Sequence, residues 1–110
     1  MDFREIYCPP FKVTDGGIYI KASNGVKAFT IAANNLEEEA KNIVLLLNDE
    51  GGEKYDSTML FGDAKIVTSH ASVLITRGFG YLIGTLKLSV EDACKIQDEF
   101  TDWVIKKLKK

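Results

Sequence analysis

The same order of segments occurs twice along this chain: short strand-type stretches separated by turns, then one amphipathic helical stretch. The first set occupies about residues 8–50 and the second residues 57–110. A unit of roughly 50 residues buries too little apolar surface to be stable alone. We therefore predict that both sets share one core in a single domain, residues 1–110. The expected fold is α+β, a two-layer sandwich with a mostly antiparallel sheet of six or seven strands and two helices on one face. The likeness of the two sets also suggests an internal ββ(β)α duplication.

Two dipeptides divide the first half into strands. Asp15-Gly16 and Asn24-Gly25 are typical of type I′ hairpin turns, whose two central residues both need positive φ. They predict a meander of three strands at about 11–14, 17–22 and 26–32. In the second half, segments rich in β-branched and aromatic residues predict four further strands: STMLF, AKIVTS, SVLIT and GYLIGTLKL. Counting all of these segments gives the larger figure of seven strands.

Each half ends in a helix that has a recognisable cap and an apolar stripe. Asn35 is the expected N-cap of the first helix, with Glu38 completing a capping box, and this helix ends near Asn48. Ser89 is the expected N-cap of the last helix. The apolar residues recur at helical spacing: Leu36, Ala40, Ile43, Val44 and Leu47 in the first helix, and Ala93, Ile96, Phe100, Trp103, Val104 and Leu108 in the last. Both stripes are predicted to pack on the sheet.

Composition and charge exclude several classes of protein. With 45% hydrophobic and 27% charged residues, the chain is typical of a folded domain rather than of a disordered segment. The longest apolar run, Ile43 to Leu47, is too short to cross a membrane, and the first ten residues contain no apolar signal core. We expect a cytoplasmic protein with no membrane partner. The formal net charge of −2 also has the opposite sign to that of a typical nucleic-acid-binding domain.

The chain offers few groups for catalysis or for metal binding. It has one histidine, His70, and two cysteines, Cys8 and Cys94, without the spacing of a metal site. Ser69 and Ser72 flank the histidine in a predicted turn, where serines usually cap backbone groups rather than attack substrates. The glycines lack the residues that accompany them in phosphate-binding loops. We therefore predict that the protein is not an enzyme and has no metal site and no cofactor.

The octet RGFGYLIG, residues 77–84, resembles the longer motif of the RNA-recognition motif family. The resemblance implies that Phe79 and Tyr81 alternate onto one sheet face and stack on bases, while Arg77 pairs with a phosphate. The segment IYI at 18–20 resembles the start of the shorter motif of that family. The order of elements departs from the family, because a strand follows 18–20 where a helix should begin. Binding of RNA or single-stranded nucleic acid through the sheet face is the alternative function.

A second resemblance covers most of the chain. The stretch RGFGYLIGTLKLSVEDACKIQDEFTDWVIKKL is similar to small uncharacterised proteins of bacteriophages and related mobile elements. The shared features are an Arg-Gly-aromatic-Gly turn, a Leu-rich stretch and a helix that is matched here by Ala93, Ile96, Gln97, Asp98, Trp103 and Val104. CPPFKVTDGGIYIKASNGVKAF and NNLEEEAKNIVLLLND are similar to short phage proteins as well. The resemblance implies a phage or mobile-element origin and an α+β fold, and it carries over no catalytic residues.

These features together predict a binding protein that acts on a host protein or captures a small anionic ligand, with a homo-oligomer as one form it could take. The candidate ligand-binding residues are Arg77, Phe79, Tyr81, Tyr19 and Lys21. Lys21 and Arg77 would receive an anionic group, and the aromatic rings would stack beside it. The alternative is that these rings pack in the core or in a contact between subunits.

Overall fold

The computed structural model describes residues 2–14, 16, 18–76 and 78–110, which form one six-stranded sheet and several helices. The strands are β1 (Lys12–Thr14), β2 (Tyr19–Lys21), β3 (Lys27–Ala33), β4 (Thr58–Phe61), β5 (Lys65–Thr68) and β6 (Ala71–Ile75). The helical segments are the 3₁₀-helix η1 (Phe3–Glu5), α1 (Leu36–Leu47), the π-helix η3 (Gly80–Thr85) and α2 (Val90–Leu108). The predicted α+β class is confirmed, with six strands rather than seven.

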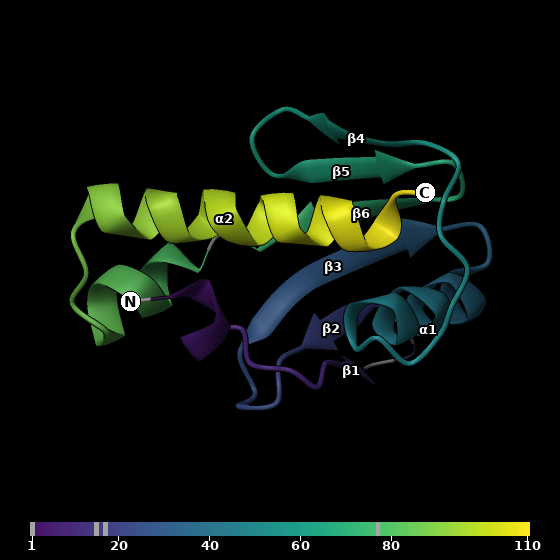
Figure 1. Ribbon diagram of the computed structural model, residues 1–110. Helices are drawn as coiled ribbons and strands as arrows, with labels where there is room; N and C mark the ends of the chain where they lie inside the picture. Colours follow the sequence, from purple (N-terminus) through teal and green to yellow (C-terminus); the bar gives the residue numbers. More distant parts are fainter. Residues whose placement is uncertain (1, 15, 17, 77) are drawn as a thin grey trace.

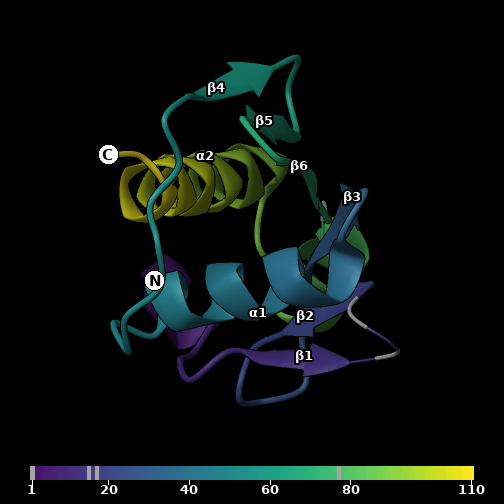
Figure 2. The same cartoon turned by 90° about the vertical axis from the view of Figure 1, so that its right-hand side faces the viewer.

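Each half contributes one meander of three strands, and the two meanders join in the middle of the sheet. All neighbouring strands are antiparallel, in the order β1-β2-β3-β6-β5-β4. The third strands of the two halves, β3 and β6, therefore pair with each other. Figures 1 and 2 show the sheet curving around α1 and α2, which both lie on its concave side. This arrangement leaves the convex face of the sheet without a helix among the residues described.

The core lies between the sheet and the two helices. Alternation along the strands places one set of buried side chains on the concave face: Ile20, Phe29, Ile31, Ile66, Val73 and Ile75. The helices bury Ala40, Ile43 and Leu47 from α1 and Ala93, Ile96, Phe100, Val104 and Leu108 from α2. All of these residues belong to one hydrophobic cluster that draws on both halves of the chain. The predicted apolar stripes are the surfaces that pack.

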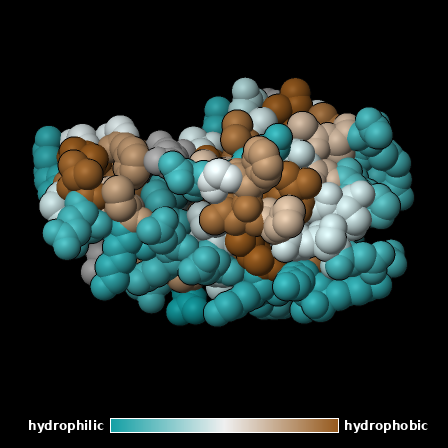
Figure 3. All heavy atoms as spheres, turned by 90° about the horizontal axis from the view of Figure 1, so that it is seen from above, coloured by the Kyte–Doolittle hydropathy of each residue, from teal (hydrophilic) through white to brown (hydrophobic). Residues whose placement is uncertain are grey.

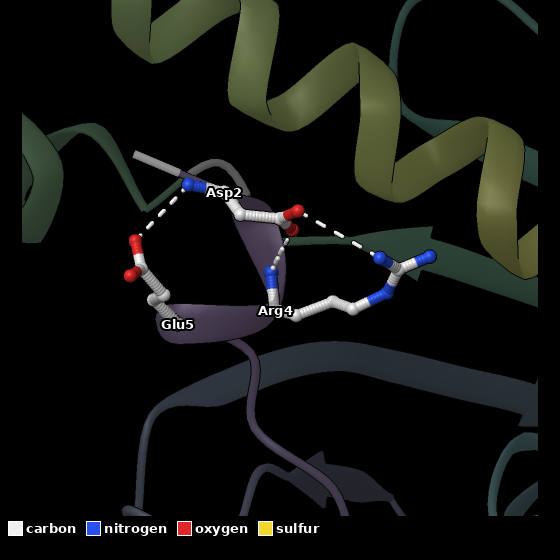
Figure 4. Close-up of polar contacts among 3 residues, drawn as sticks. All are labelled: Asp2, Arg4 and Glu5. Atoms are coloured by element: carbon white, nitrogen blue, oxygen red, sulfur yellow. Dashed lines mark hydrogen bonds and ion pairs between the residues drawn. The ribbon is translucent and has the colours of Figure 1, made fainter.

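The residues before β1 complete this core, a role that the sequence does not predict. The Tyr7 ring stacks on the Phe100 ring, with centroids 4.1 Å apart, and the Phe3 ring lies 6.0 Å from the same ring. A local set of hydrogen bonds shapes η1, as Figure 4 shows. The Asp2 N–H donates to the Glu5 carboxylate at 3.0 Å, and the Arg4 N–H donates to the Asp2 carboxylate at 2.8 Å. This capping box orients the segment so that its aromatic rings cover α2.

The predicted strand GYLIGTLKL is wrong, because Gly80–Thr85 form a π-helix. This segment cannot pair beside β6, the strand that precedes it, because β6 already lies between β3 and β5. The chain beyond β6 must also leave the sheet and cross to the helix layer. A helical signal is present in the sequence, since Phe79, Leu82, Ile83 and Leu86 follow the i, i+3, i+4, i+7 spacing. Leu82 is fully buried, as that spacing requires.

The turn between β2 and β3 also differs from the prediction. Gly25 has a φ of 87°, but Asn24 is not left-handed, so the turn is not type I′. The Ala22 N–H donates to the Val26 carbonyl at 2.8 Å and closes a three-residue loop. The Asn24 side chain donates to the Ile6 carbonyl at 2.9 Å. Asn24 therefore connects the loop to the N-terminal segment instead of taking a left-handed conformation.

The two predicted helix caps have different outcomes. The Ser89 hydroxyl accepts a hydrogen bond from the Asp92 N–H at 3.1 Å, as predicted. Asn35 is the N-cap residue of α1, but its side chain makes no cap hydrogen bond and instead donates to the Glu38 carboxylate. The predicted capping box is therefore absent at α1. The other predicted type I′ turn includes Asp15, which lies outside the described residues.

Candidate functional site

The convex face of the sheet, here called the open face, carries a continuous set of side chains. One row of directly opposite residues crosses all six strands: Thr14, Tyr19, Thr30, Leu74, Lys65 and Phe61. A second row crosses four strands: Ala32, Ser72, Val67 and Met59. Residues that face each other in an antiparallel pair project from the same side of a sheet. The two rows therefore form one surface, opposite to the helices.

Every charged residue in the six strands is a lysine: Lys12, Lys21, Lys27 and Lys65. Lys12 of β1 lies opposite Lys21 of β2, and Lys21 lies opposite Lys27 of β3 beside a register shift in the β2–β3 pairing; these three residues are here called the lysine row. Like charges placed directly opposite each other destabilise a sheet. Among the residues described, none of these four lysines forms an ion pair with a carboxylate.

The acidic residues gather on the other side of the molecule. Of the 16 aspartates and glutamates in the chain, eight lie in α1 and α2. The two helices carry eight acidic residues and four lysines, so the helix layer is net negative, whereas the strands carry lysine as their only charged residue type. The net charge of the chain does not reveal this distribution, because it contains no information on where the charges lie.

Exposed apolar side chains occupy the β4 end of the open face. Phe61 is 64% exposed, Met59 61% and Leu74 53%. Leu60, on the other side of β4, is 46% exposed. Figure 3 shows hydrophobic residues gathered on the side of the molecule where the β4–β5 hairpin lies. Three of these four residues belong to one four-residue strand, so the exposure is concentrated rather than scattered.

Aromatic rings contact lysines at both ends of the open face. The Lys27 ammonium lies 3.8 Å from the centroid of the Tyr19 ring, and the Lys65 ammonium lies 5.8 Å from that of Phe61. Both distances are within the range of a cation–π interaction. Each ring thus holds an ammonium group at the surface, where an anionic partner could contact it. Tyr19 is among the residues predicted to bind a ligand, whereas Lys27, Lys65 and Phe61 are not.

The structure brings together only part of the predicted ligand-binding set. Tyr19 and Lys21 both project from β2 onto the open face, beside the lysine row. Tyr81 is 37% exposed in the π-helix, and Phe79 precedes that helix, so their predicted alternation on a sheet face is wrong. Arg77 lies outside the described residues. A signal for the missed residues exists in the sequence, because the predicted strands contain lysine as their only charged residue type.

Phe79 lines a pocket of about 260 Å³ between α2 and the β4–β5 turn, together with Gln97. Gln97 is 6% exposed, and its amide N–H donates to the Tyr7 hydroxyl at 2.6 Å. Its other amide atom, Oε1, has no hydrogen-bond partner in the described structure. A side chain at Gly78 would place its Cβ 3.4 Å from the Tyr7 hydroxyl, so glycine allows a close approach of the chain here. Burial raises the pKa of Tyr7 above its usual value, although the bond from Gln97 acts in the opposite direction.

A second, polar pocket of about 210 Å³ surrounds Tyr55 and includes His70. Tyr55 is 3% exposed, and its hydroxyl donates to the Glu39 carboxylate at 2.6 Å. Burial, and then this hydrogen bond, raise the pKa of Tyr55 well above its usual value. At the rim, the Lys110 ammonium lies 2.8 Å from the Asp56 carboxylate and holds the pKa of that carboxyl below its usual value. These contacts join α1, the loop before β4 and the last residue of the chain.

Other features and the comparisons add no site of known type. In the part of the chain that the structure describes, no three histidine, cysteine, aspartate or glutamate side chains are grouped so as to hold a metal ion. None of its described helices combines the length and the apolar character needed to pass through a bilayer. Comparison with protein-family models, with curated proteins and with solved structures finds no match. The resemblances to phage proteins and to the RNA-recognition motif family therefore remain predictions.

Proposed function

We propose that this chain is a non-enzymatic, cytoplasmic binding protein whose open face binds an acidic surface of another protein. The observation that carries the proposal is the lysine row, Lys12, Lys21 and Lys27, on three adjacent strands. Neighbouring strands lie about 4.8 Å apart, so the bases of these side chains are close together. Carboxylates placed over the row would replace repulsion between ammonium groups with attraction.

The apolar end of the same face favours a protein over a small anion. Met59, Phe61 and Leu74 present exposed carbon surface that a phosphate or a carboxylic acid would not use. Protein interfaces obtain most of their affinity from a few apolar and aromatic side chains, and charges at the rim provide orientation and a fast association rate. The open face has both components, with apolar residues at the β4 end and lysines at the β1 end.

Nucleic acid is the second candidate, because two aromatic residues, Tyr19 and Phe61, lie on the same lysine-bearing face. Single-stranded nucleic acid binds to proteins through aromatic stacking combined with positive charge. The central strands, however, present Thr30, Leu74 and Ser72 where a stacking platform would need rings. These features rank an acidic protein above RNA.

The resemblance to small phage proteins supports a host protein as the partner. Small phage proteins often modify processes of the host cell, which is consistent with a binding role for this chain. This step is an analogy at the level of origin. The physical support for the proposal comes from the open face alone.

The test compares two variants with the same change in net charge. The open-face variant replaces its four strand lysines: K12Q, K21Q, K27Q and K65Q. The control variant replaces four exposed lysines on or beside the helices: K41Q, K95Q, K106Q and K109Q. Fluorescence anisotropy measures binding to a labelled random copolymer of glutamate and tyrosine, and in parallel to labelled oligo(U). We expect the open-face variant to bind the copolymer at least about tenfold more weakly than the control variant, equivalent to about 1.4 kcal/mol.

Each outcome has a distinct meaning. Equal weakening in both variants would show that only net charge matters, and the proposal would fail. Absence of copolymer binding by the wild-type protein would also refute it. Tighter binding to oligo(U) than to the copolymer, with a steep decrease of affinity as salt rises, would replace the acidic protein with nucleic acid as the partner.

A further inference from the structure

Strand β4 is an edge of the sheet with unpaired backbone groups. Among the residues described, it pairs with β5 alone and is last in the strand order. The Ser69 N–H donates to the Ser57 carbonyl at 3.1 Å, at the start of this pairing. Hydrogen-bonded and non-hydrogen-bonded pairs alternate along an antiparallel ladder. Met59 and Phe61 therefore direct their N–H and C=O groups toward β5, whereas Thr58 and Leu60 direct theirs outward, to the free edge.

This edge lacks the features that normally prevent strand addition. Exposed edges are usually protected by charged residues, by proline or by a bulge. The sequence of β4, TMLF, contains neither a charge nor a proline, and three of its four side chains are exposed. The opposite edge, β1, is shorter and carries Lys12. The unprotected edge is therefore β4, and it adjoins the apolar end of the open face.

The charges beside β4 indicate what kind of strand would pair there. Lys65, opposite Phe61, is the single charged residue of β4 and β5, and its ammonium group lies beside the Phe61 ring at the edge. A second copy paired edge to edge would add no carboxylate from its own β4 and β5 to either Lys65. An extended segment with acidic residues on the open-face side would instead place a carboxylate near Lys65. Charge complementarity thus favours an acidic segment over self-association.

We infer that an extended, acidic segment of the protein partner adds to β4 as a seventh strand of the sheet. This inference rests on the proposed function and specifies how the partner is held. The outward N–H and C=O groups of Thr58 and Leu60 supply the backbone hydrogen bonds. Alternate side chains of the segment project onto the open face, where Met59, Phe61 and Lys65 select apolar and acidic residues.

The probe is a library of random decapeptides displayed on yeast and selected for binding to the wild-type protein. We expect the enriched peptides to carry Asp or Glu at alternate positions, with β-branched or aromatic residues between them. Selected peptides are then synthesised and measured against Leu60→Pro and Leu60→Ala. Proline at 60 removes only an outward N–H, which an edge strand tolerates. We expect at least about tenfold weaker binding with Leu60→Pro and less than about threefold with Leu60→Ala.

A second measurement leaves the protein unchanged and so does not depend on how Leu60→Pro folds. Each selected peptide is made in two forms, N-methylated at odd or at even positions. A paired strand directs alternate N–H groups at its neighbour. One form should therefore lose binding and the other should keep it. Equal loss or equal retention would overturn strand addition, as would failure of the library to enrich any peptide, or enrichment without acidic residues.

The two proposals can fail separately. If the open-face lysine variant loses the selected peptides while Leu60→Pro binds them normally, the proposed function stands and strand addition is wrong. If Leu60→Pro loses them while the lysine variant binds normally, the edge is a docking site but the acidic-partner function is wrong. A dimer in native mass spectrometry that Leu60→Pro abolishes would assign the edge to a second copy, against this inference.

Discussion

The substitution Tyr55→Phe tests how the buried phenol stabilises the fold, because it removes one hydroxyl and keeps the ring. Tyr55 is 3% exposed, and its hydroxyl donates to the Glu39 carboxylate at 2.6 Å. A hydrogen bond to a charged group contributes about 1.5–3 kcal/mol to stability. Because Glu39 is only half-buried, we expect the lower value. At pH 7, Tyr55→Phe should therefore reduce the free energy of unfolding by about 1.5 kcal/mol.

The same tyrosine should make the wild-type protein sensitive to alkali. Burial raises its pKa in the folded state above the ordinary value of 10.0 that it has when unfolded. The folded state therefore holds the proton more tightly. This contribution to stability is complete below pH 10 and is lost as the pH rises above it. At pH 11, ionisation stabilises the unfolded wild-type chain by about 1.4 kcal/mol, an effect that the phenylalanine variant lacks.

The two proteins should consequently differ in stability at pH 7 and become nearly equal at pH 11. Urea unfolding, followed by far-UV circular dichroism, measures both free energies. All other side chains are common to the two proteins, so their contributions cancel in the comparison. Tyr81→Phe is the control for removal of an exposed hydroxyl, because Tyr81 is 37% exposed and the change should leave the free energy of unfolding nearly unaltered. A Tyr55→Phe difference that is the same at pH 7 and pH 11 would refute this account of the buried phenol.

Two further predictions concern stability and use the same urea assay. Gly84→Ala should raise the free energy of unfolding by about 0.4–1 kcal/mol, because a methyl group there would meet no atom within 4 Å. Gly52→Ala should lower it, because Gly52 has a φ of 89° and the added Cβ would lie 2.9 Å from Leu46. Effects of the same sign in the two variants would contradict both structural reasons. Gln97→Leu should lower the free energy of unfolding by about 1–3 kcal/mol, because it leaves the buried Tyr7 hydroxyl without its hydrogen-bond partner. Adding Tyr7→Phe should recover most of that loss. A double variant less stable than Gln97→Leu alone would show that the two side chains do not act as an isolated pair.

Local signals in the sequence predicted the helices and most of the strands because neighbouring residues alone produce them. The α2 helix begins after Ser89, and its hydroxyl makes the expected cap. The apolar spacing of both helices corresponds to residues that are buried, among them Ile43 and Phe100. Period-two and period-3.6 patterns can be read from short windows. A helix spacing was also present at 79–86, but the β-branched and aromatic residues there gave a competing strand signal.

The candidate site could be predicted only in part. Tyr19 and Lys21 were predicted from their place on the first hairpin, as a ring and a cation for an anionic group, and they do project from the sheet away from the helices. Lys12 and Lys27, which complete the lysine row with Lys21, come from other strands. Which residues are opposite each other depends on register, and register depends on turn geometry, which was predicted incorrectly at Asn24-Gly25. The lysine row was therefore not visible before the strands were paired.

The sequence by itself determined the class of the fold. The order of strand and helix patterns indicates an α+β fold, and each half is too small to form a core of its own, so the two halves share one. Tertiary structure alone decided which strands lie at the edges, that β6 is paired on both sides, and that the chain after it turns helical. It also separated the acidic helices from the lysines of the open face. The physical reason is that periodicity is a local property, whereas pairing, edges and charge separation are set by contacts between residues far apart in the chain.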